Sequence, residues 1–453
     1  ERGKITICSK DMNKTEIPEE LMNKLRSTVV LAGAILGRFK KATFSYPGGC
    51  NIGARPIDLH LDAFSKLGIK IEEKENKIIC NCKEIVGKRI KLKFPSVGAT
   101  ENIILASVYA KGATHISGAA KEPEIKDLAK ALNSMGAKVY GAGTSEITIF
   151  GVNKLHSTSY KIMSDRIETG TLLCAAASTN GNITVENTNP ENLMTVLFTL
   201  REMGCKISIN KDKISLKGPN KIKPIEIETK PYPGFPTDMQ PLICAVLISS
   251  TGKSKITENI FENRFKYTEE LKKMGANIVQ KEKTIEILGS SKIEGNVVTS
   301  KDLRGGAALV IAGLMAEGET LVEDAKYILR GYESLDEKLR KLGAEIIMSK
   351  LNKSKKTNKV KNTNKIKKEN TSPKQEGIFN FDNEIKSENK KVTRTTKKNS
   401  SKRIKQEDHF IGTKEVAPIN KKKLEKIKKE KLKEKRTKEK EVVKAQKRQE
   451  KEG

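Results

Sequence analysis

Five pairs of residues, each a Leu or Met followed by Gly, end predicted helices at a nearly regular spacing, and this spacing constrains the fold most. A glycine after the last apolar residue of a helix is typical of a C-cap, where the backbone turns into the left-handed conformation. Successive glycines are 68, 68, 71 and 68 residues apart. Such a period predicts a repeated, compact α/β unit rather than a short solenoid repeat. The pairs are Leu67-Gly68, Met135-Gly136, Met203-Gly204, Met274-Gly275 and Leu342-Gly343.

Short alternating stretches follow the pairs, and apolar runs open the units. The alternation predicts half-buried strands at 69–71, 137–139, 205–207, 276–278 and 344–346. The opening runs are rich in Ala, Leu, Ile and Val, which predicts helices buried on most sides. They cover residues 26–35, 100–110, 170–177, 239–248 and 307–316. Buried helices surrounded by strands with polar outer faces predict an α/β barrel with its helices inside.

Charge and cysteine usage exclude several classes of protein. The net charge of +31 comes mostly from residues 351–453, which carry 35 Lys or Arg and 15 Asp or Glu. This segment has few core-forming residues, so we expect a disordered or partly helical tail. The simpler interpretation is a solvated tail without a partner, and the functional alternative is weak binding to an anionic polymer such as RNA. No apolar run reaches membrane-spanning length. The seven cysteines form no disulfide pattern, which predicts reduced thiols and a cytoplasmic protein.

Metal and histidine chemistry find little support in the sequence. Cys80-Asn81-Cys82 is too closely spaced, and too poor in further ligands, to predict a zinc site, so no metal is expected. The four histidines form no catalytic triad and no ligand cluster, which favours structural or surface positions for all of them. They are His60, His115, His156 and His409.

The run from Tyr46 to His60 combines three glycines, a thiol and a guanidinium in one short segment. Gly48, Gly49 and Gly53 predict a bent loop. A thiol in a cationic setting ionises more easily than a free one, and Cys50 precedes an arginine by only five residues. The planar fork of Arg55 suits a phosphate or a carboxylate. The simpler alternative is a turn that contains an incidental cysteine.

Polar clusters stand near the predicted helix starts of the repeated units. Helix N-termini carry unpaired N–H groups and partial positive charge, so converging helix starts would bind an anion. The alternative for each single cluster is N-capping, the usual role of Ser, Thr and Asp at a helix start. The clusters are Arg26, Ser96–Thr100, Asp165–Gly170, Phe235–Gln240 and Asp302–Gly306, followed by Glu262–Arg264 and Arg330–Glu333.

Together these segments resemble the UDP-N-acetylglucosamine 1-carboxyvinyltransferase family of enolpyruvyl transferases, and Pro47–Pro56 is its most specific motif. The resemblance covers nearly all of residues 1–350. It implies a two-domain inside-out α/β barrel, with domains over 1–163 and 164–350 and a separate tail over 351–453. It also implies a monomer without a cofactor. The family has six units and a Ser-Gly-Ala-Lys-Asn motif in the first; this chain has five units and lacks that motif, so we expect an N-terminally truncated chain.

The reaction implied is attack of the 3-hydroxyl of UDP-N-acetylglucosamine on C2 of phosphoenolpyruvate, followed by loss of phosphate. The product is the first committed intermediate of peptidoglycan synthesis. Two alternatives stay open: a catalytically inactive homologue that lacks the Lys-Asn motif, and a 3-phosphoshikimate 1-carboxyvinyltransferase. The second has the same fold but is not expected to carry the Gly-Gly-Cys loop.

Residue roles follow from the same resemblance. Asp238 is expected to be the base, Cys50 the proton donor and Arg330 the third catalytic residue. Arg26, Arg55 and Arg330 would hold phosphate and carboxylate, with support from Arg264. Asp302 would orient the closed state, Asp165 would lie near the hinge, and Ile328-Leu329 replaces a common Asp before Arg330. The remaining expected substrate-binding residues are Pro56, Ile57, Asp58, Leu59, Ser96, Val97, Gly98, Glu122, Ile260 and Arg304.

Overall fold

The computed structural model describes residues 3–48, 52–53, 56–289 and 292–349, which belong to one compact unit, Glu1–Lys355. Cys50, Arg55 and the predicted tail over 351–453 lie outside the described residues. Among the described residues, no helix has the length and apolar character needed to cross a membrane.

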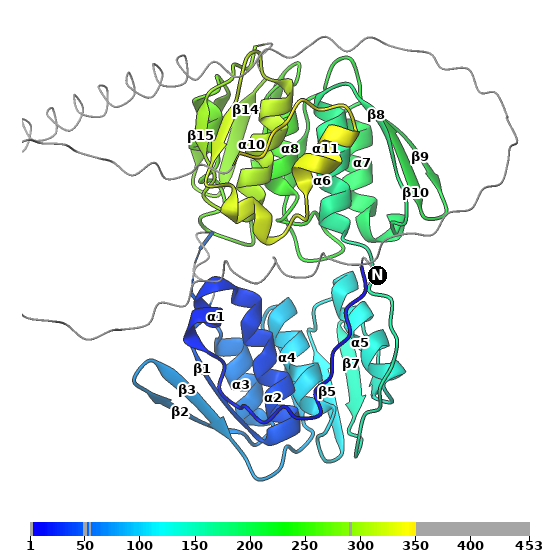
Figure 1. Ribbon diagram of the computed structural model, residues 1–453, viewed down its shortest axis with the longest axis vertical. Coiled ribbons are helices and arrows are strands. Elements are labelled where there is room, and N and C mark those ends of the chain that lie inside the picture. Colours follow the sequence, from blue (N-terminus) through cyan, green and yellow to red (C-terminus); the bar gives the residue numbers. More distant parts are fainter. Residues whose placement is uncertain (1–2, 49–51, 54–55, 290–291, 350–453) are drawn as a thin grey trace, which may run out of the picture. The chain divides into compact units, whose positions relative to one another are not determined.

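Residues 3–163 form one series of helices and strands (Figure 1). The helices are α1 (Glu19–Lys24), the 3₁₀ helix η1 (Arg26–Val30), α2 (Leu31–Phe39), α3 (Asp58–Lys66), α4 (Val97–Ser107) and α5 (Pro123–Ser134). The strands are β1 (Lys41–Ser45), β2 (Lys70–Lys74), β3 (Lys77–Asn81), β4 (Arg89–Lys91), β5 (Ala113–Ser117), β6 (Lys138–Tyr140) and β7 (Glu146–Phe150).

Residues 164–349 repeat this series. The helices are α6 (Arg166–Ser178), η2 (Pro190–Leu193), α7 (Met194–Glu202), α8 (Gln240–Leu247), α9 (Thr268–Lys272), α10 (Leu303–Met315), η3 (Ala325–Arg330) and α11 (Leu335–Lys341). The strands are β8 (Asn182–Val185), β9 (Lys206–Asn210), β10 (Lys213–Lys217), β11 (Glu226–Glu228), β12 (Lys253–Thr257), β13 (Asn277–Lys281), β14 (Thr284–Leu288), β15 (Val297–Thr299) and β16 (Leu321–Glu323).

Every sheet is built from strands that lie close together in the sequence, and in three sheets the first strand precedes the helix that opens the unit. Two sheets have four strands in the orders β4-β5-β7-β6 and β11-β12-β14-β13, with a parallel first pair and antiparallel pairs after it. The registers correspond, because Ile116 opposes Ile147 in one sheet and Ile256 opposes Ile285 in the other. The other sheets are β1-β3-β2, β8-β10-β9 and the parallel pair β15-β16. The repeated α/β unit is therefore confirmed.

All five predicted glycine C-caps are confirmed. Gly68, Gly136, Gly204, Gly275 and Gly343 have φ angles of +87°, +96°, +102°, +94° and +98°, a region that side chains disfavour. Four of the predicted strands follow these glycines as β2, β6, β9 and β13. The prediction of a strand at 344–346 was wrong, since residues 344–349 form no strand. The other four each pair with the next strand along the chain, and no such partner follows among the described residues.

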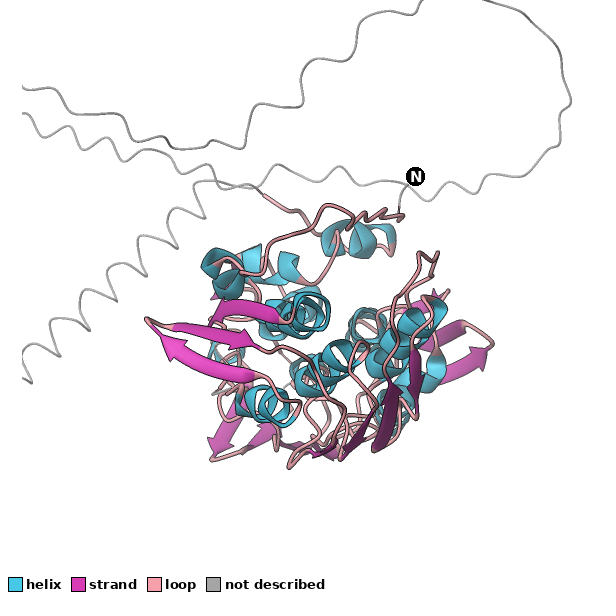
Figure 2. Cartoon of the chain, turned by 90° about the horizontal axis from the view of Figure 1, so that it is seen from below, coloured by secondary structure: helices cyan, strands magenta, loops and turns pink. Residues whose placement is uncertain are grey.

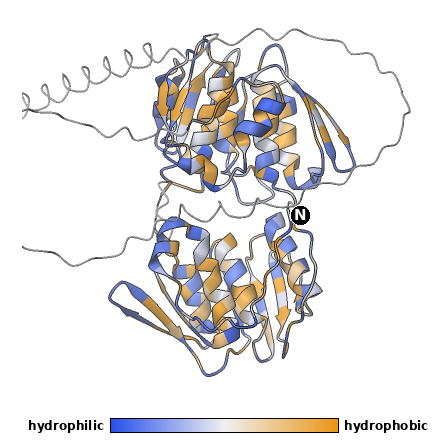
Figure 3. Cartoon of the chain, in the orientation of Figure 1, coloured by the Kyte–Doolittle hydropathy of each residue, from blue (hydrophilic) through white to orange (hydrophobic). Residues whose placement is uncertain are grey.

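The helices that open the units lie inside, as the apolar runs predict. All residues of α8 are buried, as are most residues of α6 and α10, and these three helices contact one another. Figure 1 shows them with strands on either side, and the helices in Figure 2 likewise lie between strands. Their apolar colouring is plain in Figure 3. One hydrophobic core gathers buried residues from Ile17 to Ile149, and another gathers those from Ile167 to Leu339.

Candidate active site

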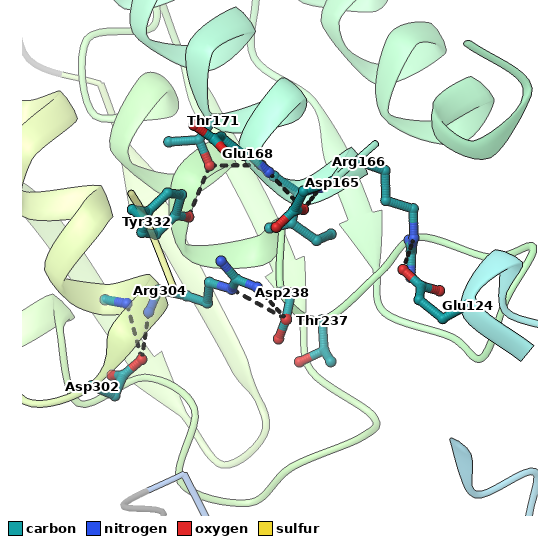
Figure 4. A network of polar contacts seen from close by, with 12 residues as sticks. Glu124, Asp165, Arg166, Glu168, Thr171, Thr237, Asp238, Asp302, Arg304 and Tyr332 are labelled. Atoms are coloured by element: carbon teal, nitrogen blue, oxygen red, sulfur yellow. Dashed lines mark hydrogen bonds and ion pairs between the residues drawn. The ribbon is translucent and has the colours of Figure 1, made fainter. Parts of the chain in front are cut away.

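Asp238 stands just before α8 and contacts two arginines from different segments, of which Figure 4 labels Arg304. Its Oδ1 accepts a hydrogen bond from Nη2 of Arg264 at 2.7 Å. Its Oδ2 accepts from Nε of Arg304 at 3.2 Å, and Nη2 of Arg304 lies at the same distance. Such charge-assisted contacts are the strong hydrogen bonds of proteins. The predicted site residues Asp238, Arg264 and Arg304 are thus brought together.

The two arginines control the ionisation of Asp238. Burial alone would raise the pKa of this carboxyl, but the charges of Arg304 and Arg264 outweigh burial and lower the pKa to about 2. Asp238 is therefore ionised at neutral pH. A carboxylate with so low a pKa is a weak base, so accepting a proton requires that its contact with the arginines change.

Asp302 supports the same cluster from the start of α10. Its Oδ1 caps the helix by accepting from the backbone N–H groups of Arg304 at 3.1 Å and Gly305 at 3.0 Å. The same oxygen lies 4.0 Å from Nη1 of Arg264. Asp302 therefore caps α10 and at the same time belongs to the charged cluster, because the same carboxylate makes both sets of contacts.

Arg304 also contacts an aromatic residue that the sequence did not single out as a site residue. Its guanidinium carbon lies 5.2 Å from the ring centroid of Tyr332, whose hydroxyl is 2.9 Å from Oγ1 of Thr171 on α6. Nη1 of Arg304 is buried without a hydrogen-bond partner among the described residues. A buried guanidinium with an unused donor is suited to bind a phosphate or carboxylate oxygen.

Glu258 organises the segment beside Asp238, and the sequence analysis missed it. This buried carboxylate accepts from Oγ1 of Thr229 at 2.8 Å and Oγ1 of Thr237 at 2.9 Å. It also accepts from the backbone N–H groups of Ile260 at 2.8 Å and Phe261 at 3.2 Å. Glu258 therefore fixes both the residue before Asp238 and the start of the segment that leads to Arg264.

Predicted site residues of the first series gather at the starts of η1, α3 and α4. Arg26 begins η1, Asp58 and Leu59 begin α3 after the buried Ile57, and Pro56 is exposed. Ser96 caps α4, with Oγ accepting from the backbone N–H of Ala99 at 3.3 Å, and Val97 and Gly98 are its first residues. The carbonyl of Ile52, in the predicted loop, accepts from the backbone N–H of Asn263 at 3.0 Å.

A group of carboxyls lies where α4 and α5 begin. Burial, helped by the charges of Glu124 and Glu122, raises the pKa of Glu101 to about 7. Burial also raises the pKa of Glu122, although backbone donors and Arg166 oppose the shift. Glu124 is paired with Arg166, whose Nε lies 2.9 Å from its Oε1 (Figure 4). The predicted residue Glu122 therefore belongs to a carboxyl cluster with a cation beside it.

The structure sets Asp165 and Arg330 apart from the ion pairs of Asp238. Asp165 caps α6 by accepting from the backbone N–H groups of Ile167 at 2.7 Å and Glu168 at 3.0 Å. Arg330 ends η3 with an exposed side chain and takes no part in the contacts that join Asp238 to its arginines. The catalytic role given to Arg330 stays a prediction.

The missed residues gave little signal in the sequence. Tyr332 lies in the Arg330–Glu333 motif, but only its ring contact with Arg304 marks it out. Thr171 lies within an apolar helix, and Glu258 follows a strand, which is an ordinary place for a surface carboxylate. Their distance along the chain from Asp238 hides their relation to it.

Comparisons with known proteins identify the family of the chain. Residues 1–339 match the family model described as EPSP synthase (3-phosphoshikimate 1-carboxyvinyltransferase). UDP-N-acetylglucosamine 1-carboxyvinyltransferase 2 of Caldanaerobacter subterraneus subsp. tengcongensis is 52% identical over 344 residues, covering 76% of this chain and 82% of that protein. The corresponding enzyme 1 of Carboxydothermus hydrogenoformans is 48% identical over 342 residues, covering 76% and 81%.

Solved structures show the same fold. The enolpyruvyl transferase NikO from Streptomyces tendae matches with a TM-score of 0.66 at 22% identity, over 74% of this chain and 80% of that one. An EPSP synthase from Acinetobacter baumannii matches with a TM-score of 0.54 at 20% identity, over 70% and 77%. The chain therefore belongs to the enolpyruvyl transferase family, and within it to the UDP-N-acetylglucosamine 1-carboxyvinyltransferases.

Proposed function

We propose that this protein transfers the enolpyruvyl group of phosphoenolpyruvate to the 3-hydroxyl of UDP-N-acetylglucosamine and releases phosphate. The observation that carries the proposal is Asp238 held between Arg264 and Arg304, in a chain about half identical to enzymes named for this transfer. The product would feed peptidoglycan synthesis in the cytoplasm. The catalytic domains would span residues 1–163 and 164–350.

The mechanism assigns one kind of chemistry to each group. Arg26, Arg55 and Arg330 neutralise the phosphate and carboxylate of phosphoenolpyruvate, and Cys50 protonates its CH2 carbon. Asp238 accepts the proton of the 3-hydroxyl as that oxygen bonds to C2. Phosphate then leaves C2 as the new methyl group loses a proton, which restores the CH2 double bond of the enolpyruvyl group. An anionic substrate that draws Arg304 away from Asp238 would raise the pKa of the carboxylate, because the positive charge of Arg304 is a main cause of its low value. Substrate binding would thereby make Asp238 a stronger base.

The nucleotide sugar would lie against the helix starts described above. Pro56–Leu59 and Ser96–Gly98 would line its site together with Ile260, and Glu122 would contribute from the start of α5. Asp302 would hold Arg264 in place, and Asp165 would steady the start of α6 near the hinge. No metal is needed for this chemistry, since guanidinium groups neutralise the developing charge.

Phosphate release tests the proposal directly. The complete chain is incubated with phosphoenolpyruvate and either UDP-N-acetylglucosamine or shikimate 3-phosphate, beside a Cys50→Ala control. We expect release only with the nucleotide sugar, and loss of release in the control. Release with shikimate 3-phosphate would contradict the proposed acceptor. Binding of UDP-N-acetylglucosamine without phosphate release would instead support an inactive homologue.

A further inference from the structure

The side chain of Asn102 connects three helical segments in the interior of the first series. Asn102 lies on α4 and is fully buried. Its Oδ1 accepts from the backbone N–H of Gly33 at 2.7 Å, and its Nδ2 donates to the carbonyl of Val29 at 3.1 Å. Nδ2 also lies 2.7 Å from Nδ1 of His60 on α3. One amide thus bonds to α2, η1 and α3 at once.

These partners fix the orientation of the amide and the tautomer of the histidine. A backbone N–H can only donate and a backbone carbonyl can only accept, so Oδ1 must face Gly33 and Nδ2 must face Val29. The second hydrogen of Nδ2 then points to Nδ1 of His60, which must accept it. Since the acceptor nitrogen carries no proton, the ring is neutral and is protonated on Nε2.

Two of the three connected segments, η1 and α3, carry predicted substrate-binding residues, and so does the start of α4, the helix of Asn102 itself. η1 begins at Arg26, and His60 directly follows Asp58 and Leu59. The His60 ring also packs against the start of α4, where a Cβ on Gly98 would lie 3.1 Å from its Cε1. A shift of the His60 ring or of the Asn102 amide would therefore displace the starts of η1, α3 and α4.

The surroundings of His60 favour the neutral ring. Burial and the positive charge of Arg26 together lower the pKa of His60 to about 4, while Asp58 opposes the shift. A second proton would have to occupy Nδ1. It would then face the N–H of Asn102 and add a positive charge close to Arg26.

We propose that Asn102 and His60 are positioning residues, which hold Arg26, Pro56–Leu59 and Ser96–Gly98 in register for an anionic nucleotide-sugar ligand and do so only with a neutral His60. The assignment of the ligand rests on the proposed function, whereas the bonding pattern does not. Neither side chain is assigned a catalytic step. Asn133 on α5 offers a matched control, because its amide also bonds to backbone groups, the N–H and carbonyl of Val139 at 2.9 and 2.8 Å.

Nuclear magnetic resonance of the complete chain, labelled with ¹⁵N in histidine and backbone, tests the bonding pattern without a ligand. The pair of histidine ring ¹⁵N signals that disappears in His60→Gln belongs to His60. In the unchanged protein we expect these signals to show that Nδ1 carries no proton and Nε2 carries one. Asn102→Asp places a carboxylate oxygen against Nδ1, so the pKa of His60 should rise by about 1 to 3 units. The backbone signals of Arg26 and 96–98 should shift in Asn102→Asp and stay in place in Asn133→Asp.

Calorimetric binding of UDP-N-acetylglucosamine tests the positioning role. We expect Asn102→Asp to bind about tenfold more weakly, a loss of about 1.4 kcal/mol. Asn133→Asp should bind normally. A proton on Nδ1 of the unchanged protein would overturn the proposal, as would equal affinities in Asn102→Asp and Asn133→Asp. Absence of binding by the unchanged protein, with the expected histidine signals, would contradict the proposed function instead.

Discussion

Removal of the Asp238 charge should destabilise the protein through the arginines left behind. Asp238 and Arg304 are 3.2 Å apart, and two unit charges at that distance attract by about 5 kcal/mol at an effective dielectric constant of about 20. However, 40% of the Asp238 side chain is exposed, and pairs on the surface contribute only about 0.2–1 kcal/mol. We therefore expect a coupling free energy of about 1–2 kcal/mol between the two side chains.

A double-mutant cycle measures this coupling. Urea unfolding at neutral pH compares the unchanged protein with Asp238→Asn, Arg304→Gln and the double variant. The double variant should be about 1–2 kcal/mol more stable than the sum of the single effects predicts. Arg201→Gln is the matched control, because exposed Arg201 contacts only the carbonyl of Ile207 among the described residues, at 3.2 Å. Its effect should add to that of Asp238→Asn.

The coupling between Asp238 and Arg304 should weaken in acid. The folded pKa of Asp238, about 2, lies below the unfolded value of about 3.9. Its stabilising contribution is therefore complete above pH ~3.9 and is lost as the pH falls through the folded pKa. A coupling below about 0.3 kcal/mol at neutral pH, or an equal coupling to Arg201, would refute the reasoning.

Substitutions at three further positions test other contacts by urea unfolding. Glu258→Ala should cost about 3 kcal/mol or more by leaving buried donors unpaired, whereas Glu258→Gln should cost only about 1, because the Thr237 hydroxyl can turn to accept from the new amide; equal costs would contradict this account. Gly33→Ala should cost about 1–3 kcal/mol, since its Cβ would meet the Asn102 carbonyl oxygen at 2.5 Å, and an unchanged free energy of unfolding would exclude the close packing. Glu101 has a folded pKa of about 7, above the ordinary value of 4.5 for this side chain, so its stabilising effect is complete in acid and lost as the pH rises through 7. Glu101→Gln should therefore be more stable than the unchanged protein by about 1–3 kcal/mol at about pH 8 and not at about pH 4, and a pH-independent difference would disprove the shift.

Local signals in the sequence were sufficient for the repeated unit. The Leu-Gly and Met-Gly pairs depend only on the conformation of one residue after a helix, so all five caps were predictable. The absence of a strand at 344–346 was not predictable, because a strand must pair with a neighbouring strand and an alternating sequence does not show whether that neighbour is present. The buried helices were predictable for the same reason as the caps, since an apolar run is a local property.

Only part of the charged cluster around Asp238 could be predicted from the sequence. Asp238, Arg264 and Arg304 were named through resemblance, but their mutual contacts join residues up to 66 positions apart and could not be derived from spacing. Asn102 lies inside the apolar run at 100–110, and the sequence predicts only a structural or surface position for His60. Its burial agrees with a structural position, while its bond to Asn102 across 42 residues had no signal in the sequence.

The confinement of each sheet to a short stretch of the sequence bears on how the chain acquires its structure during synthesis. Strands of β4-β5-β7-β6, for example, all lie between Arg89 and Phe150, so they can pair as soon as that stretch has left the ribosome. Contacts between neighbours in sequence form faster than distant ones. The packing of α6 against α10 must wait for more than a hundred further residues. Nascent units would therefore carry paired strands while the inner faces of their helices are still uncovered, and that is the stage at which a chaperone would bind.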